Sequence, residues 1–349
     1  MKVTLADIAY DLGVSTATVS LALRDSPLVA QDTAERVRAR AGEMGYVYNR
    51  RAASLRTKRS DIVGVIVRDI INPFFAEVLG AIEAEVGANK QTFLLCNHDD
   101  DKRAQDDFIE TLVEFGADGV ILSPAIGTTA EDVTNMERRG LPVVMVARTV
   151  ENAPADVPAF TGRDREGMRL AVAHLVDLGH RDIALVGGTR RTSTGRERRA
   201  GYAEAMEAAG LDPVPRIDIE IPYWRKAGFE AAERLVADTP TAAACCSDTV
   251  ALGLMAGLAR HGIRPGADVA VTGYDDIEEA AIATPALTTV HDGHDEIGRL
   301  AARALYEKIT GGSAEAAATV PPRLVVRESC GGGGAGTGTV DDGHHERAK

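Results

Sequence analysis

The stretch TLADIAYDLGVSTATVS, residues 4–20, decides how the head of this 349-residue chain folds. Thr4 is placed to cap a helix, because the apolar residues that follow it recur on one helix face. Gly13 provides the left-handed backbone of a tight turn, and Ser15 is placed to cap a second helix. Ala9 is small enough to let the two helices cross closely. This spacing predicts a helix-turn-helix, whose second helix can lie in the major groove of DNA.

An ordinary helical hairpin remains the other interpretation of residues 4–20, and a third helix is expected over 31–44.

The head is also set apart by its charge. The whole chain has a net charge of −13, which taken alone argues against a nucleic-acid partner. The first 60 residues, however, carry +4, which leaves −17 for the remainder, and five of the ten basic residues in the head lie within 50–59. Such asymmetry indicates a separate functional unit.

Beyond the head, apolar runs alternate with amphipathic stretches. Each predicted strand is followed by a predicted helix, and the strands lack polar alternation, which is typical of parallel sheets buried on both faces. The predicted strands are 62–67, 92–96, 119–122, 143–146, 183–186, 242–246 and 269–272, and the helices include 75–88, 103–115, 166–178, 198–209, 228–237 and 249–261. This number of strands favours two α/β subdomains. The glycine-rich residues 331–349 are expected to form a disordered tail.

Composition excludes several classes of protein. No apolar run approaches the length of a membrane span, and acidic residues interrupt the N-terminus where a signal peptide would be apolar. The four cysteines are sparse and lack metal-ligand spacing, so we expect a cytoplasmic protein without a metal or a cofactor. The acidic run at 98–101 and the glycine pair at 187–188 are the only features that suggest an enzyme, and both are more simply explained as loops. We therefore expect no catalytic residues.

Further motifs connect the head to a known family. They are GYVYNRRAASLRTKRSDIVGVIV (45–67), NPFF (72–75), DLGHRDIALVGG (177–188), SDTVALG (247–253), VTGYDD (271–276) and PRLVVRES (322–329). With them, residues 3–329 resemble the LacI/GalR (lactose/galactose repressor) family of bacterial transcriptional regulators. The resemblance implies an all-α helix-turn-helix head followed by an α/β core like the type I periplasmic binding proteins, with two parallel-sheet subdomains. The implied parts are a head (1–48), a hinge helix and linker (49–60), one core subdomain (61–160 with 292–320), the other (161–291 with 321–330) and the tail.

The same resemblance implies where DNA is contacted. Thr16 and Ala17 stand at the base-reading positions of the second helix, and Leu55 stands where the hinge leucine of the family wedges between base pairs. Tyr48 departs from the proline usual before that hinge, and a basic linker with Leu55 packed on its own domain is the alternative. The predicted DNA-binding residues are Thr4, Ser15, Thr16, Ala17, Thr18, Ser20, Asn49, Arg51, Ala53, Leu55 and Arg56.

The core is implied to bind a small-molecule effector between its subdomains. An arginine, carboxylates, small hydroxyls and aromatic faces suit a polyol, so a sugar or a sugar derivative is expected. The predicted effector-binding residues are Phe74, Phe75, Ser123, Arg198, Tyr223, Trp224, Ser247, Asp248, Asp275 and His294. Ala147 precedes Arg148 where many sugar-responsive members have an aspartate, which leaves a non-sugar effector open.

Together these features predict an effector-controlled repressor. A homodimer, with further pairing of dimers left open, would bind a near-palindromic operator, because two-fold symmetry of the protein matches that of the DNA. No membrane partner is expected. A periplasmic-type sugar-binding protein without a DNA function is the alternative. The sequence leaves open which effector binds and whether it induces or co-represses.

Overall fold

The computed structural model describes residues 3–47, 59–312 and 317–331. Its internal contacts divide the chain into two compact units, Met1–Ser60 and Asp61–Lys349. No helix among these described residues is long and apolar enough to cross a membrane. The predicted hinge residues Asn49, Arg51, Ala53, Leu55 and Arg56 and the tail beyond residue 331 lie outside the described residues.

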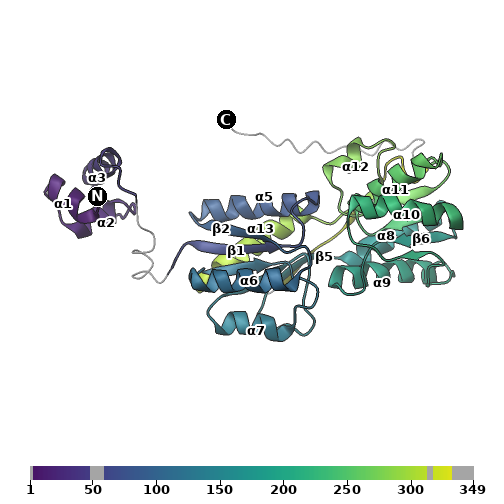
Figure 1. Ribbon diagram of the computed structural model, residues 1–349, viewed down its shortest axis with the longest axis horizontal. Coiled ribbons are helices and arrows are strands. Elements are labelled where there is room, and N and C mark those ends of the chain that lie inside the picture. Colours follow the sequence, from purple (N-terminus) through teal and green to yellow (C-terminus); the bar gives the residue numbers. More distant parts are fainter. Residues whose placement is uncertain (1–2, 48–58, 313–316, 332–349) are drawn as a thin grey trace. The chain divides into compact units, whose positions relative to one another are not determined.

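The first unit is a bundle of three short helices, α1 (Leu5–Leu12), α2 (Thr16–Ala22) and α3 (Gln31–Glu43), as predicted (Figure 1). Thr4 and Asp7 form a reciprocal capping box at the start of α1, and Gly13 ends this helix with a φ of 65°. The Ser15 hydroxyl caps α2 by accepting a hydrogen bond of 3.0 Å from the Thr18 amide. The helices share a small apolar core of Ile8, Ala9, Val19, Ala22, Ala34, Val37 and Ala41.

The second unit contains two parallel sheets. The larger has the strand order β11-β5-β4-β3-β1-β2, formed by β1 (Ile62–Val67), β2 (Thr92–Asn97), β3 (Gly119–Leu122), β4 (Val143–Val146), β5 (Ala159–Gly162) and β11 (Ala317–Val320). Helices α5 (Pro73–Ala88) and α13 (His294–Thr310) cover one face, and α6 (Lys102–Glu114) and α7 (Ala130–Arg138) cover the other (Figure 1). Neighbouring residues of β1 therefore enter different cores, Val65 on the α5 side and Ile66 on the α6 side.

The smaller sheet repeats this arrangement. Its order is β7-β6-β8-β9, formed by β6 (Ile183–Val186), β7 (Asp218–Ile219), β8 (Ala242–Cys245) and β9 (Ala270–Thr272). Helices α8 (Asp164–Asp177) and α9 (Ser193–Ala208) cover one face, and α10 (Arg225–Asp238) and α11 (Asp248–Arg260) cover the other. The short α12 (Glu278–Ile282) and the antiparallel pair β10 (Thr289–His291) and β12 (Arg323–Val325) complete the unit.

Three segments connect the two sheets. They run from β5 to α8, from β10 to α13, and from β11 to β12. Gly293 belongs to the second crossing and has a φ of 73°, and a Cβ atom there would lie 2.3 Å from Cγ1 of Val320 in the third crossing. The second crossing is thus packed closely against the end of β11, where the third crossing begins.

Candidate ligand cavity and nucleic-acid interface

The first turn of α2 offers small side chains to solvent. Thr16 and Ala17 are exposed there, and Thr18 is half-buried. Thr4 and Ser15 are also exposed, although their hydroxyls serve as helix caps. Ser20, the remaining predicted DNA-binding residue of α2, is buried. It is only 8 % exposed, because it lies between Val19 and Ala22 on the face of α2 that packs into the head.

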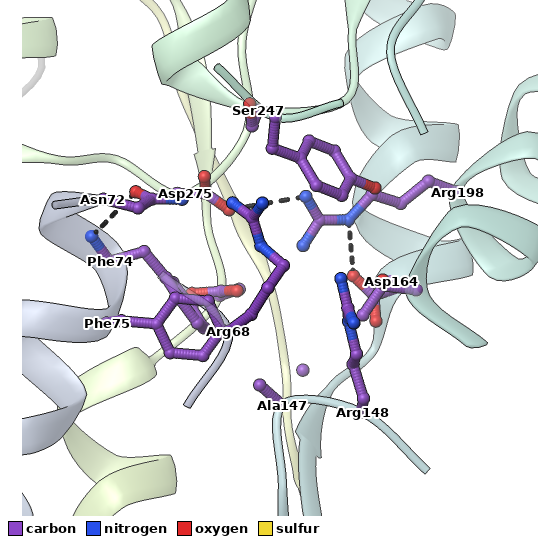
Figure 2. A pocket seen from close by; sticks show the side chains of 14 residues that line it. Arg68, Asn72, Phe74, Phe75, Ala147, Arg148, Asp164, Arg198, Ser247 and Asp275 are labelled. Atoms are coloured by element: carbon purple, nitrogen blue, oxygen red, sulfur yellow. Dashed lines mark hydrogen bonds and ion pairs between the residues drawn. The ribbon is translucent and has the colours of Figure 1, made fainter. Parts of the chain in front are cut away.

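A cavity lies between the two sheets of the second unit (Figure 2). It encloses about 480 Å³ between its side chains, a volume that includes space open to solvent. Its lining comes from the carboxyl ends of strands in both sheets, from the starts of α5, α8 and α9, and from the crossing segments. The lining residues are Arg68, Asn72, Phe74, Phe75, Ala147, Arg148, Gly162, Asp164, Thr194, Arg198, Tyr223, Ser247, Asp275 and Asp292. Six of the ten residues predicted for the effector are among them.

Arg198 is the most heavily bonded side chain of the cavity. Its Nε donates to Asp164 at 2.6 Å, and its Nη1 donates to the Cys246 carbonyl at 2.5 Å and to Asp275 at 3.4 Å. Its guanidinium lies 3.6 Å from the centre of the Tyr274 ring. Burial raises the pKa of Asp164 to about 6 and that of Asp275 to about 7, although Arg198 lowers both. The two carboxylates also raise the pKa of Arg198, against the effect of its burial.

The backbone at Asp275 is held in an unusual conformation. Its φ is 118°, a backbone conformation that residues other than glycine rarely adopt. The Asp275 amide donates to the Val290 carbonyl at 2.8 Å, which ties this turn to β10. Ala147, at the end of β4, has a φ of 61°. Two loops that line the cavity therefore carry strain, a feature that gathers at ligand-binding sites.

Aromatic rings form an apolar border of the cavity. Phe74 and Phe75 pack edge to face with centroids 5.0 Å apart. Tyr223 approaches from the other half, and its hydroxyl has no hydrogen-bond partner among the described residues. Burial raises the pKa of this hydroxyl to about 12, which keeps it a neutral donor. A ring-shaped ligand could therefore contact apolar faces while its polar groups meet the arginines and carboxylates.

Two further arginines in the lining were not predicted. Arg68 follows the last residue of β1, and Arg148 lies two residues after β4. Asn72, Gly162, Asp164, Thr194 and Asp292 were also missed. The available signal was their position at or just beyond carboxyl ends of parallel strands or at helix starts, where ligands of α/β proteins bind.

Four predicted effector residues lie outside the cavity lining. Ser123 is fully buried at the end of β3, and its carbonyl accepts a hydrogen bond of 2.9 Å from the His98 ring. The carboxylate of Asp248 has hydrogen-bond partners within the protein, because its oxygens accept hydrogen bonds from the Thr289 hydroxyl at 2.5 Å and from the Ile277 amide at 3.0 Å. Trp224 is 46 % exposed and borders a neighbouring surface hollow instead.

His294 supports the lining rather than forming it. Its two ring nitrogens lie 3.2 Å from Asp292 and 2.6 Å from Glu77, and its ring packs on Phe74 at 5.8 Å. Burial lowers the pKa of His294, but the two carboxylates outweigh it and raise the value to about 9. The group is therefore a charged element beneath the cavity wall. Within the described parts of the chain, no cluster of three or more His, Cys, Asp or Glu side chains could hold a metal ion.

Two family models match parts of the chain. Residues 4–49 match the model of bacterial regulatory proteins of the lacI family, and residues 172–330 match that of the periplasmic binding protein-like domain. Among curated proteins, the HTH-type transcriptional repressor PurR of Pasteurella multocida (strain Pm70) is 31 % identical over 329 residues, covering 93 % of this chain and 98 % of the relative. PurR of Vibrio parahaemolyticus (serotype O3:K6, strain RIMD 2210633) is 33 % identical over 331 residues, with the same coverage of 93 % and 98 %.

Solved structures give the same result. A lac repressor dimer bound to operator and to the anti-inducer ONPF superposes with a TM-score of 0.82 at 26 % identity, covering 95 % of this chain and 99 % of that one. A complex of the transcriptional regulator CelR with cellobiose superposes with a TM-score of 0.71 at 29 % identity, covering 94 % and 100 %. Both similarities extend over the head and the core.

Proposed function

Because the chain belongs to the lacI family of bacterial regulatory proteins and is a DNA-binding transcriptional repressor, we propose that a small molecule bound in the cavity between its two sheets controls its affinity for operator DNA. The observation that carries this proposal is the lining itself. Three buried arginines, three carboxylates and three aromatic rings converge on one space that draws on both sheets. A binding protein without a DNA function would not need the helix-turn-helix head.

The DNA side of the proposal rests on α2. Thr16 and Ala17 would read base edges from the first turn, and their small size suits close approach in the major groove. The hinge residues Asn49, Arg51, Ala53, Leu55 and Arg56 would hold phosphates and unstack a base step, as the family resemblance implies. A homodimer on a near-palindromic operator would place one head on each half-site, as the solved lac repressor dimer on its operator illustrates. A repressor of this kind works where the chromosome is, which in a bacterium is the cytoplasm.

The control would arise from differential binding. A ligand that contacts both halves of the core stabilises the arrangement in which both sets of contacts are made, and it shifts the population of states by the difference in its affinities. By reciprocity, operator DNA must change the affinity for the effector by the same factor. This coupling can be measured without knowing which genes are controlled.

The polar lining supports a polyol-like effector, either a sugar or a sugar derivative. Arg198 and Asp275 would pair with vicinal hydroxyls, while Phe74, Phe75 and Tyr223 would cover apolar ring faces. CelR, whose similarity covers 94 % of this chain, was solved with cellobiose, which supports a carbohydrate. Ser247 and Thr194 would add hydroxyl contacts at the rim.

Fluorescence anisotropy tests the proposal directly. The full-length protein is titrated onto labelled duplex DNA from upstream of its own gene and onto a random duplex of the same length. We expect specific binding at least about 1,000-fold tighter than random at physiological salt. A thermal-shift screen of sugars, sugar phosphates and nucleosides then identifies compounds that raise Tm, and these are added to the anisotropy assay. Equal binding to both duplexes, or identified ligands that leave operator affinity unchanged, would refute it.

A further inference from the structure

Arg68 and Arg148 bring two guanidinium groups to the same end of the cavity. They follow strands β1 and β4, which are separated only by β3 in the sheet. Both side chains are buried, with 2 % and 5 % of their surface exposed. In Figure 2, Arg68 extends through the middle of the lining, with Phe74 and Phe75 on one side and Arg198 on the other.

The two arginines differ in how many of their hydrogen-bond donors have an acceptor in the protein. Arg148 donates to both oxygens of Asp100, at 2.5 and 3.2 Å, and to the Pro124 carbonyl at 3.2 Å. Arg68 has one hydrogen bond among the described residues, from Nη2 to Asp69 at 3.2 Å. A guanidinium has five N–H donors, so most of those on Arg68 have no protein acceptor. No nitrogen of Arg68 is among the fully enclosed, unpartnered atoms of the described residues, so these donors remain accessible from the cavity that Arg68 lines.

The surroundings of Arg68 are rich in donors. Its guanidinium lies 5.7 Å from the centre of the Tyr223 ring, whose hydroxyl lacks a partner among the described residues. The methyl side chain of Ala147, beside Arg148, provides no acceptor. Burial, and next the charge of Arg148, lower the pKa of Arg68, and the charges of Asp69 and Asp100 offset this only in part.

The carboxylates of the cavity do not relieve Arg68, because they have other cationic partners. Asp164 and Asp275 are bonded to Arg198, and Asp292 is bonded to His294. The cavity is therefore polarised. One end couples carboxylates to Arg198 and His294. The other presents Arg68, Arg148 and the Tyr223 hydroxyl, and the carboxylates paired with these two arginines, Asp69 and Asp100, lie outside the cavity lining.

We propose that the effector is anionic and that its carboxylate or phosphate group binds between Arg68 and Arg148, with its remaining polar groups toward Arg198 and Asp275. This inference rests on the proposed function, since it assigns a chemical class to the effector of the same cavity. An anionic group provides several acceptors to a planar guanidinium and offsets the repulsion between the two arginines.

Inorganic phosphate is the first probe. Full-length wild type is compared with Arg68→Gln in phosphate and in chloride at equal ionic strength, by Tm and by the fluorescence of Trp224, the single tryptophan, next to Tyr223. We expect phosphate to raise the Tm of wild type and Arg68→Gln to bind it roughly 10- to 100-fold more weakly. Arg190→Gln is the matched control, because Arg190 is a surface arginine paired with Asp218 and Glu220, and its response should equal that of wild type.

A second variant distinguishes loss of the anion site from misfolding of the protein. Arg68→Lys keeps the charge but loses the planar donors, so it should retain part of the phosphate response. If wild type shows no phosphate response, or if Arg68→Gln responds as wild type does, the anion site is overturned.

Matched ligand pairs then distinguish a carboxylate from a phosphate. Galacturonate is compared with galactose, and glucose 6-phosphate with glucose. The inference requires that at least one anionic member binds more tightly than its neutral partner and loses this advantage in Arg68→Gln. Neutral sugars that bind equally well and alter operator affinity would refute the inference but leave the proposed function intact. If anions bind through Arg68 but no ligand alters operator affinity, the anion site is supported and the proposed function is refuted.

Discussion

Arg198 forms ion pairs with two buried carboxylates, and its removal should therefore strongly destabilise the folded protein. In Arg198→Leu, Asp164 and Asp275 lose the cation that lowers their pKa values from within the cavity wall. Breaking a buried ion pair from one side typically costs about 3–5 kcal/mol. We expect a loss of this size in urea unfolding at pH 8 and a smaller loss at pH 5, where the carboxyls are protonated at little cost.

The companion variant for this prediction is Arg198→Leu with Asp275→Asn. Because the amide carries no charge, the double variant should recover part of the stability that Arg198→Leu loses at pH 8. An Arg198→Leu protein whose stability loss is the same at both pH values would contradict the role given to these carboxylates.

His294 predicts a pH dependence of the core. Its folded-state pKa is raised to about 9 from the usual 6.5, so the folded protein holds a proton that the unfolded chain releases. The associated stability is fully present below pH 6.5 and is lost as the pH rises through 9, by about 3 kcal/mol at most. His294→Gln should flatten this decline, measured by urea unfolding between pH 6 and 9.5. The exposed His261→Gln serves as its control and should keep the wild-type slope.

At the scale of elements, alternation of apolar runs predicts most of the fold. The strands β1, β3, β4 and β6 begin and end where the sequence predicts them. The helix predicted from 198 begins at Ser193 instead, because Thr192 caps it and the polar first turn hides the start. The strands β5, β7, β10, β11 and β12 were not predicted, since two to four residues without an apolar run carry no periodic signal.

The cavity is harder to predict than the elements that carry it. Sequence motifs identify strand ends, but they do not reveal which side chain turns inward. Ser123 follows β3 and is buried beneath the lining, whereas Arg68 follows β1 and enters the cavity. Asp248 and His294 likewise appear as binding residues in a motif, yet each is satisfied by contacts with distant parts of the chain. Such contacts depend on long-range packing.

The first turn of α2 yields a prediction for DNA binding. Ala17→Glu adds an acid to a helix N-terminus, which favours the helix, but it also places a negative charge where phosphates and base edges would approach. We expect operator affinity to fall at least roughly tenfold while the melting temperature of the head is kept or raised. Ala39→Glu makes the same charge change on an exposed position of α3 and should affect operator affinity much less. Equal losses in the two variants would show that α2 does not face DNA.

For the whole molecule, the net charge of −13 conceals how little positive charge the helices of the head offer to DNA. Arg38 pairs with Asp25 at 2.6 Å, and Arg40 pairs with Asp11 at 2.6 Å and with Glu43 at 2.8 Å. These two bases are compensated within the head, which leaves Arg24 and Arg36 as the bases of the described helical part without an ion pair. Five further basic residues lie within 50–59, where the sequence contains no acid. The electrostatic part of operator binding should therefore come mainly from this short segment.

Salt titrations separate these two groups of bases. Each phosphate contact that is removed should reduce the slope of log K against log salt by about 1. We expect Arg56→Gln to reduce the slope by this amount, because it removes a base from the segment that has no acidic partner in sequence. Arg40→Gln should leave the slope nearly unchanged while lowering the stability of the head, since it breaks the contact between α3 and Asp11 of α1. If Arg40→Gln instead reduces the slope and Arg56→Gln does not, the phosphate contacts belong to the helices and the charge argument fails.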